Sequence, residues 1–259
     1  MKEFIKKYWK TLLFFTLSGL IGGFLVGLFV YDSYPIEIKQ QILDSFNGSI
    51  DENYIDVLLG VVTAFQSAAY GLILGGIGIF LGKKVLLWKD EQNITKKPLI
   101  ITLIIACLGG VLMILLDVLF FGKYSDVIMA SYHSKPSIAY ILGSIIYGGV
   151  IEEVMLRLFF MSLISFVLFK LFERKKEEPS SYIHIVSNVV AALLFAIGHL
   201  PNTFILLGNT PLIIFRCILM TGGFGLLFGY LYHKHGLRYA MLGHAGMHIV
   251  SKLIWLLFI

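Results

Sequence analysis

Apolar residues occur along the chain in seven long runs that are separated by short polar segments. Each run reaches or approaches the ~20 residues that a helix needs to cross a hydrocarbon core about 30 Å thick. The runs predict membrane-spanning helices at residues 11–31, 55–82, 99–121, 137–172, 183–200, 211–232 and 237–259. The expected fold class is therefore all-α: a polytopic membrane helix bundle with about seven to eight transmembrane helices.

The fourth run is too long for one helix perpendicular to the membrane. Residues 137–172 would extend about 54 Å as a straight helix at ~1.5 Å per residue. We expect this helix to project from the bilayer, to tilt, or to break at Gly148-Gly149. A break there would add an eighth half-span.

Composition and charge support a membrane protein. The chain is 58% hydrophobic and 14% charged, and its net charge is +5. A positive charge can indicate nucleic-acid binding, but 15 of the 21 Lys and Arg residues lie in four polar segments on one expected side. This positive-inside pattern places the N-terminus in the cytoplasm and argues against a nucleic-acid partner. The short loops suit a multi-pass protein of the cell membrane, specifically a bacterial plasma membrane.

The chain is expected to form one integral membrane domain with two parts. Residues 1–136 hold the first three transmembrane helices and their loops, including a short amphipathic helix at about 36–46 in an external loop. Residues 137–259 form the expected catalytic helical core. Glycines at intervals of four, such as Gly19, Gly23 and Gly27, predict close contact between helices.

Two adjacent carboxylates and one arginine interrupt the fourth apolar run, at Glu152, Glu153 and Arg157. Ionisable groups at membrane depth are costly, so they usually have partners and a function. Glu153 and Arg157 are four residues apart, and an ion pair between them is expected. Glu152 then remains the unpaired acid, on the face of Gly148 and Gly149. It is the candidate general base or acid; the alternative is a structural polar cluster that joins three helices.

The other polar candidates are histidines in the fifth and seventh runs. His199 lies two residues before Pro201, and proline disfavours helix at the preceding residue, so we expect His199 near a helix end. His244 and His248 are four residues apart and share a helix face. This spacing can bind a metal, as in His-Glu-x-x-His proteases, but residue 245 is alanine, so the base of that motif is missing. The pair can equally supply hydrogen-bond donors or be structural.

Three short motifs in this order resemble one protein family. They are Glu-Glu-x-x-x-Arg at residues 152–157, Phe-x-x-x-His at 195–199, and His-x-x-x followed by a polar residue at 244–248. Together they resemble the CPBP family of intramembrane proteases, also called the Abi or CAAX protease family. Its eukaryotic branch is the type II CaaX prenyl endopeptidase. The resemblance covers about residues 138–251.

The resemblance implies an intramembrane glutamic endopeptidase with a defined set of site residues. It makes Glu152 the general base on a water molecule, assisted by His199, and makes His244 and His248 the donors that hold the oxyanion. Its supporting residues are Glu153, Arg157 and Phe195. The family more often has asparagine or aspartate at the last of these donor positions. A neutral imidazole can still donate one hydrogen bond, so the oxyanion role remains open to His248.

No cofactor is expected, and zinc is the alternative. The four residues Glu152, His199, His244 and His248 carry donor atoms of the kinds that zinc binds. A metal-free site is chemically coherent, because peptide hydrolysis needs a base for the water and donors for the oxyanion. We favour the metal-free mechanism.

Residue counts place these groups at unequal depths. At ~1.5 Å per residue, Glu152 and His199 lie roughly 25–30 Å from the expected cytoplasmic helix ends, His244 about 10 Å and His248 about 16 Å. Tilted helices, a broken helix or shifted helix ends would be needed to bring them together. The catalytic interpretation requires that they meet.

The expected function is hydrolysis of a peptide bond in a membrane-associated peptide or protein. Prokaryotic members of the family are associated with peptide maturation, bacteriocin self-immunity and regulation of sensor kinases. A membrane sensor kinase or a secreted-peptide system is therefore a candidate partner, beside the lipid bilayer itself. The alternative is a non-catalytic membrane regulatory or immunity protein that binds such a kinase or peptide. A third interpretation is an ion or proton carrier, because buried Glu and His can form a relay.

Overall fold

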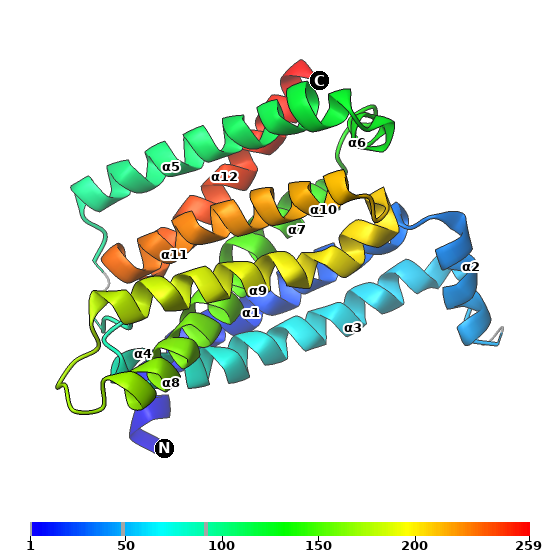
Figure 1. Ribbon diagram of the computed structural model, residues 1–259. Coiled ribbons are helices and arrows are strands. Elements are labelled where there is room, and N and C mark those ends of the chain that lie inside the picture. Colours follow the sequence, from blue (N-terminus) through cyan, green and yellow to red (C-terminus); the bar gives the residue numbers. More distant parts are fainter. Residues whose placement is uncertain (1, 48–49, 91–92) are drawn as a thin grey trace.

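The computed structural model describes residues 2–47, 50–90 and 93–259, and in these residues the regular secondary structure is helical. Seven helices of the described chain are long and apolar enough to cross a membrane. The predicted all-α polytopic bundle is therefore confirmed. The N- and C-termini lie at opposite ends of the bundle (Figure 1), as an odd number of spans requires.

The first three spans occupy the N-terminal half. The first span is α1 (Lys2–Ser33), and the short α2 (Ile36–Ser45) that follows it confirms the predicted amphipathic helix. The second span comprises α3 (Ile55–Ala69), η2 (Tyr70–Leu74) and α4 (Gly75–Lys84), and the short η1 (Glu52–Tyr54) precedes it. The third comprises α5 (Lys96–Leu115), η3 (Leu116–Phe120) and η4 (Phe121–Lys123), and the short α6 (Asp126–Ala130) comes after it.

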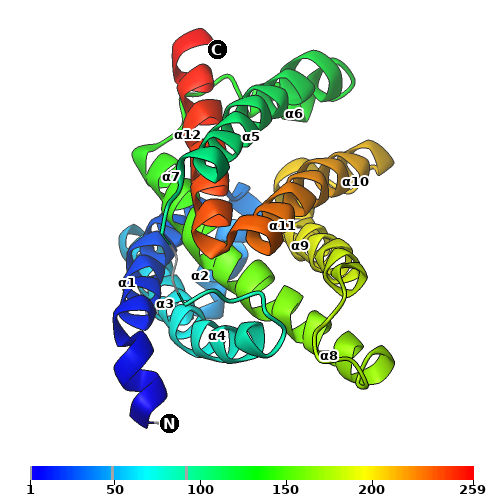
Figure 2. The same ribbon diagram turned by 90° about the vertical axis from the view of Figure 1, so that its left-hand side faces the viewer.

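The fourth span is continuous. It consists of α7 (Ile138–Gly143), η5 (Ser144–Glu152), η6 (Val154–Met161) and α8 (Ser162–Phe172), where η5 and η6 are π-helical. Of the three alternatives, a break at Gly148-Gly149 and the eighth half-span that it would add are not found in the described chain. The helix is tilted: it crosses the bundle obliquely between the other helices, as Figure 2 shows, and this oblique path accommodates its length. π-Helical segments occur often at functional sites, and here Glu152 is the last residue of η5 and Glu153 lies between η5 and η6.

The last three spans contain a second departure from the sequence prediction. The fifth span, α9 (Ser181–Leu207), continues through Pro201, so the predicted helix end near His199 is wrong. Proline removes one backbone hydrogen bond, whereas ending the helix in hydrocarbon would leave several backbone groups unpaired. The sixth span comprises α10 (Pro211–Cys217), η7 (Ile218–Gly222) and α11 (Gly223–His235), and the seventh is α12 (Leu237–Phe258).

Glycine sets the close contact of α1 with α3. A Cβ atom at Gly23 would lie 2.5 Å from the Thr63 carbonyl oxygen and 2.6 Å from Ser67 Oγ, so only glycine allows this approach. Gly19 and Gly27 lie on the same face of α1 and meet the backbone of α3 in the same way. The packing predicted from the glycine spacing is therefore confirmed. The division of the chain at residues 136 and 137 stays a prediction.

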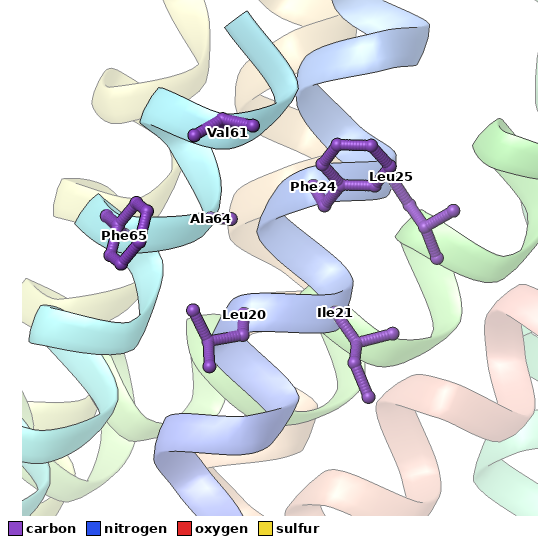
Figure 3. A pocket seen from close by; sticks show the side chains of 7 residues that line it. All are labelled: Leu20, Ile21, Phe24, Leu25, Val61, Ala64 and Phe65. Atoms are coloured by element: carbon purple, nitrogen blue, oxygen red, sulfur yellow. The ribbon is translucent and has the colours of Figure 1, made fainter. Parts of the chain in front are cut away.

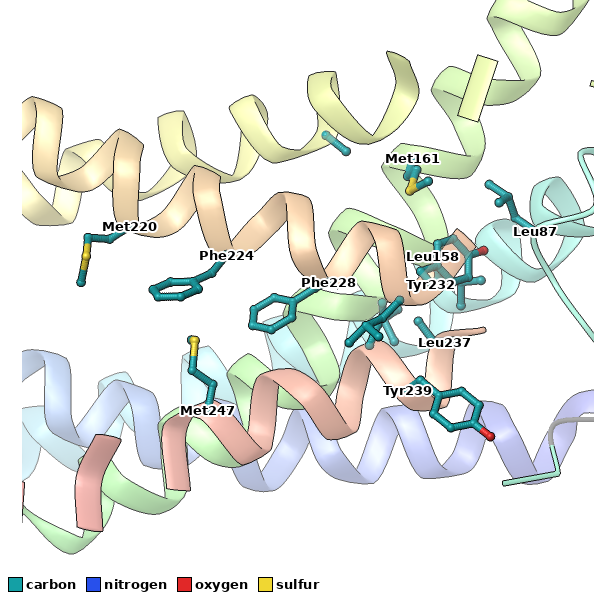
Figure 4. Close-up of a cluster of buried hydrophobic side chains, with 14 of the residues drawn as sticks. Leu87, Leu158, Met161, Met220, Phe224, Phe228, Tyr232, Leu237, Tyr239 and Met247 are labelled. Atoms are coloured by element: carbon teal, nitrogen blue, oxygen red, sulfur yellow. The ribbon is translucent and has the colours of Figure 1, made fainter. Parts of the chain in front are cut away.

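A buried apolar cluster fills the space between α11, α12 and η6. Phe224, Phe228 and Tyr232 follow one another at intervals of four on α11 and line its inner face, with Met247 of α12 and Leu158 of η6 nearby (Figure 4). All five side chains are less than 9% exposed. The cluster fixes α11 and α12 relative to the fourth span.

A shallow groove between α1 and α3 is lined only by apolar residues (Figure 3). Its lining residues are Leu20, Ile21, Phe24, Leu25, Val61, Ala64 and Phe65. Several of these side chains are strongly exposed, Phe65 at 68%. Because the groove contains no polar side chain, it suits contact with lipid and provides no groups for catalysis.

Asp90 joins the beginning of α1 to the end of α4. Its carboxylate lies 2.7 Å from Lys7 Nζ and 3.3 Å from Lys83 Nζ, and it accepts hydrogen bonds from Tyr8 and from the Trp88 indole. The ammonium group of Lys7 and the hydroxyl of Tyr8, followed by Lys83, hold the pKa of Asp90 well below its usual range.

The Asp90 contacts predict a small dependence of stability on pH. Ionised Asp90 stabilises the folded state above the pKa of about 3.9 that this carboxyl has in the unfolded chain. The contribution is lost as the pH falls through that value toward the lower folded pKa. We expect Asp90→Asn to melt about 1–3 °C below wild type at pH 6, and the difference to begin to shrink as the pH falls below about 4. A difference that is the same at pH 6 and at pH 2 would contradict this assignment, and thermal denaturation in detergent measures it.

Candidate active site

The ion pair predicted within the fourth span is present and fully buried. Arg157 Nη1 lies 3.0 Å from Glu153 Oε1, and the two side chains are 2% and 0% exposed. Arg157 also donates to the Gly225 carbonyl oxygen at 2.9 Å, and its guanidinium group lies 4.8 Å from the centre of the Phe195 ring. The supporting residues of the sequence prediction are thus in mutual contact. They connect the fourth span to α9 and α11.

Glu152 faces two histidines from two other helices. Its Oε1 lies 3.7 Å from His199 Nε2 on α9, and its Oε2 lies 3.8 Å from His244 Nε2 on α12. Both distances exceed those of a direct hydrogen bond. The carboxylate is 17% exposed, whereas Glu153 is fully buried. The two adjacent glutamates therefore differ as expected: one is fixed by an arginine, and the other lies open between two imidazoles.

The hydrogen bonds of the two histidines fix their orientation. His199 Nδ1 lies 2.9 Å from the Phe195 carbonyl oxygen, and His244 Nδ1 lies 2.8 Å from Glu153 Oε1. Because both oxygens only accept, each Nδ1 carries a hydrogen and donates it. In the neutral rings, the Nε2 atoms that face Glu152 then carry lone pairs. A water molecule placed beside Glu152 could donate to the carboxylate and to an imidazole together.

His248 extends this arrangement along α12. Its Nε2 lies 3.1 Å from His244 Nε2, and the two rings are stacked with centroids 4.9 Å apart. With His244 neutral, the Nε2–H of His248 donates to His244 Nε2. His248 Nδ1 is buried and has no hydrogen-bond partner within the described residues. For His248 to hold an oxyanion, its Nε2–H must exchange the His244 nitrogen for the substrate oxygen.

The unequal depths expected from residue counts do not separate these groups. Such counts assume parallel helices that begin at one level, but α12 is inclined to α5 and α11 (Figure 1). A single residue, Gly236, separates α12 from α11, and its φ of +103° suits only glycine. The α12 helix crosses the fourth span where Gly148 and Gly149 leave room, and a Cβ at Gly149 would lie 2.7 Å from Ala245 Cβ. The condition for a catalytic interpretation is therefore met.

Gly148 also borders the histidine pair. A Cβ atom at this position would lie 2.9 Å from His248 Nε2 and 3.4 Å from His244 Nε2. Gly148→Ala should therefore push the His248 ring aside, and a displacement of this kind can lower activity by about 10²-fold. Peptide hydrolysis by the folded variant measures the effect, and Gly198→Ala is the control, because a Cβ at Gly198 meets nothing within 4 Å. Equal activity of the two variants would contradict this role for Gly148.

The donor atoms do not fit zinc as they are arranged. A metal would need the lone pairs of several ligands directed at one point. Instead, the Nε2 atoms of His244 and His248 are hydrogen-bonded to each other at 3.1 Å. In the described part of the chain, no group of three or more His, Cys, Asp or Glu side chains has the geometry of a metal site.

Three side chains at or beside the site lay outside the sequence prediction. The Phe228 ring stacks on His244 at 4.4 Å, and Tyr147 interacts electrostatically with Glu152. Lys252 lies one turn beyond His248 on α12 and interacts with it electrostatically. In the sequence, Phe228 and Tyr147 look like ordinary packing residues of apolar helices. For Lys252, its position four residues after His248 was a signal that could have placed it beside the site. Asp117 and Arg216 form a separate ion pair at 2.5 Å.

Comparison with known families identifies the second half of the chain. A family model described as type II CAAX prenyl endopeptidase Rce1-like matches residues 134–250, which include all three motifs. No curated protein and no solved structure matches the chain. The family supports a membrane-embedded endopeptidase in general terms. Residues 134–250 therefore match an Rce1-like type II CAAX prenyl endopeptidase domain, in a chain whose described residues include seven candidate membrane spans.

Proposed function

We propose that this protein is an intramembrane endopeptidase that hydrolyses a peptide bond of a membrane-associated peptide or protein, with Glu152 as the general base. One observation carries the proposal: the Glu152 carboxylate lies between the Nε2 atoms of His199 and His244, at 3.7 and 3.8 Å. Each histidine is held by a hydrogen bond on its other nitrogen. Such a pre-arranged set of acid and imidazoles at membrane depth suits proton transfer.

The reaction begins with a water molecule held by Glu152 and His199. Glu152 takes one proton from the water as its oxygen attacks the carbonyl carbon of the peptide bond. The electron pair of the C=O bond moves to the oxygen, which becomes the oxyanion. His248 donates its Nε2–H to this oxygen. In this tautomer His244 Nε2 carries a lone pair and cannot donate, so the oxyanion role expected for both histidines is proposed for His248 alone, with His244 beside it. The oxyanion's electron pair then re-forms the C=O bond as the C–N bond breaks. The leaving nitrogen takes the proton from Glu152, which gives a carboxylic acid and an amine.

The supporting residues act on the orientation and charge of this set. Arg157 neutralises Glu153, so the Glu153 oxygen can accept from His244 Nδ1 without adding net charge beside Glu152. Phe195 contacts both the Arg157 guanidinium group and the His199 ring. The mechanism uses no metal. The Lys and Arg distribution supports a cytoplasmic N-terminus. We place the protein in a bacterial plasma membrane, where its substrate is a peptide or a sensor protein of the same membrane.

The proposal is tested by comparing cells that produce wild-type protein with cells that produce Glu152→Ala. Membrane-associated and secreted peptides are compared by mass spectrometry at equal amounts of folded protein. We expect one or more cleavage products to disappear with the variant and their longer precursors to accumulate. Identical peptide profiles would favour a non-catalytic binding protein, because a scaffold does not need the carboxylate.

A further inference from the structure

Lys252 is a buried lysine to which the mechanism above gives no role. It is 3% exposed on α12, and its Nζ donates to the Tyr140 hydroxyl at 2.8 Å and lies 4.0 Å from the centre of the same ring. The Trp255 ring lies 5.6 Å from Nζ. Within the described residues, none of the ion pairs includes Lys252. A buried ammonium group without a carboxylate is costly, and aromatic rings offset only part of that cost.

The position of Lys252 connects it to the glutamate–histidine cluster, by which we mean Glu152, Glu153, Arg157, His199, His244 and His248. Residues 244, 248 and 252 follow one another at intervals of four on α12, so they share one helix face. Lys252 and His199 both interact electrostatically with His248. The lysine is therefore the next charged group beyond the proposed oxyanion donor.

The charges of the site balance only when Lys252 is included. Glu152 and Glu153 carry two negative charges and Arg157 one positive charge, which leaves one negative charge when the histidines are neutral. Lys252 supplies the missing positive charge. The next charged groups on this side, Asp117 and Arg216, neutralise each other. Four further polar side chains face Glu152 or Lys252 and carry no fixed charge: His199, His244, Tyr147 and Tyr140.

During the reaction the negative charge moves in the direction of Lys252. It begins on Glu152, beside His199 and His244, and it ends on the oxyanion beside His248, one helical turn from the lysine. A fixed cation near the end point stabilises the transition state more than the ground state, which is the condition for raising kcat. We propose that Lys252 is a positioning residue of the reaction, whose fixed positive charge favours the oxyanion at His248. This inference rests on the proposed function.

The test compares variants of the full-length protein in liposomes, acting on a peptide substrate identified in the cellular comparison. Lys252→Met removes the charge, and we expect kcat to fall about tenfold with KM unchanged. A tenfold change is the size expected when a unit charge moves a few ångströms toward a cation at an effective dielectric constant near 20. Lys252→Arg keeps the charge and should stay within about threefold of wild type. Tyr140→Phe keeps both the ring and the lysine and should behave like wild type. If Lys252→Met does not fold, Lys252→Gln, which retains a donor toward Tyr140, should show the same fall.

Three results would overturn the proposal. The first is wild-type kcat in the folded neutral variants. The second is a folded Lys252→Arg variant that is as slow as Lys252→Met, and the third is a loss confined to KM, because either of these would indicate a packing or binding role. Glu152→Gln in the same assay distinguishes a failure of the proposed function from a failure of the role of Lys252. If it hydrolyses the peptide like wild type, the proposed function fails; if only the lysine variants behave like wild type, the role of Lys252 alone fails.

Discussion

Glutamine at position 152 is expected to lower kcat/KM for peptide hydrolysis by about 10³-fold or more, while the protein stays folded. A general base contributes about 10²- to 10⁴-fold to the rate, and a glutamine amide cannot take the proton from water. The amide has nearly the same size as the carboxylate. Since Glu152 lies 3.7 and 3.8 Å from its two histidines, the substitution breaks no short hydrogen bond to them.

The matched control for this variant is Glu177→Gln, which removes one carboxylate from the exposed turn after α8. It should hydrolyse the peptide at the wild-type rate. Both variants are compared in liposomes at equal amounts of folded protein, with initial rates followed by mass spectrometry of the products. Equal rates for Glu152→Gln and Glu177→Gln would remove Glu152 from the mechanism.

Methionine at position 157 is expected to destabilise the folded protein by about 3–5 kcal/mol. The Arg157 guanidinium group is the cation paired with the buried Glu153, and it also satisfies the Gly225 carbonyl oxygen. Its removal leaves two neighbouring carboxylates without a paired cation at membrane depth. The expected fall in melting temperature is about 10 °C, measured by thermal denaturation in detergent.

A double variant shows whether Arg157→Met loses stability through the unpaired charge or through lost packing. Glu153→Gln combined with Arg157→Met removes both charges and leaves an amide oxygen to accept from His244, so it should regain much of the stability lost in the single variant. A double variant less stable than Arg157→Met would show that packing of the guanidinium group against Phe195 and Phe228 dominates. Arg174→Met, in the exposed turn, is the control and should melt like wild type.

Spacing along one helix was enough to predict the local parts of the site. Residues four apart on a helix face are neighbours, so the Glu153–Arg157 pair and the contact of His244 with His248 follow from the sequence. The seven spans follow from run length and apolar composition in the same way. These features depend on the backbone of a single helix. They can therefore be predicted without knowledge of the tertiary structure.

Contacts between helices could not be predicted from spacing. The meeting of Glu152 with His199 and His244 depends on the tilt of α12 and on its crossing at Gly148 and Gly149. The continuation of α9 through Pro201 depends on the cost of unpaired backbone in hydrocarbon, which local proline rules leave out. A lysine near the end of a span normally extends to the interface. The burial of Lys252 therefore emerges only from its contacts with Tyr140 and Trp255.

The hydrolytic role of Glu152 is tested most directly by tracing solvent oxygen into the product. Purified wild-type protein and Glu152→Gln are reconstituted in liposomes without added metal and incubated with the identified peptide in water enriched in ¹⁸O. The mechanism predicts that wild type releases a product whose new carboxyl group carries one ¹⁸O atom and that Glu152→Gln releases about 10³-fold less. Labelled product formed by Glu152→Gln at the wild-type rate would contradict the central claim.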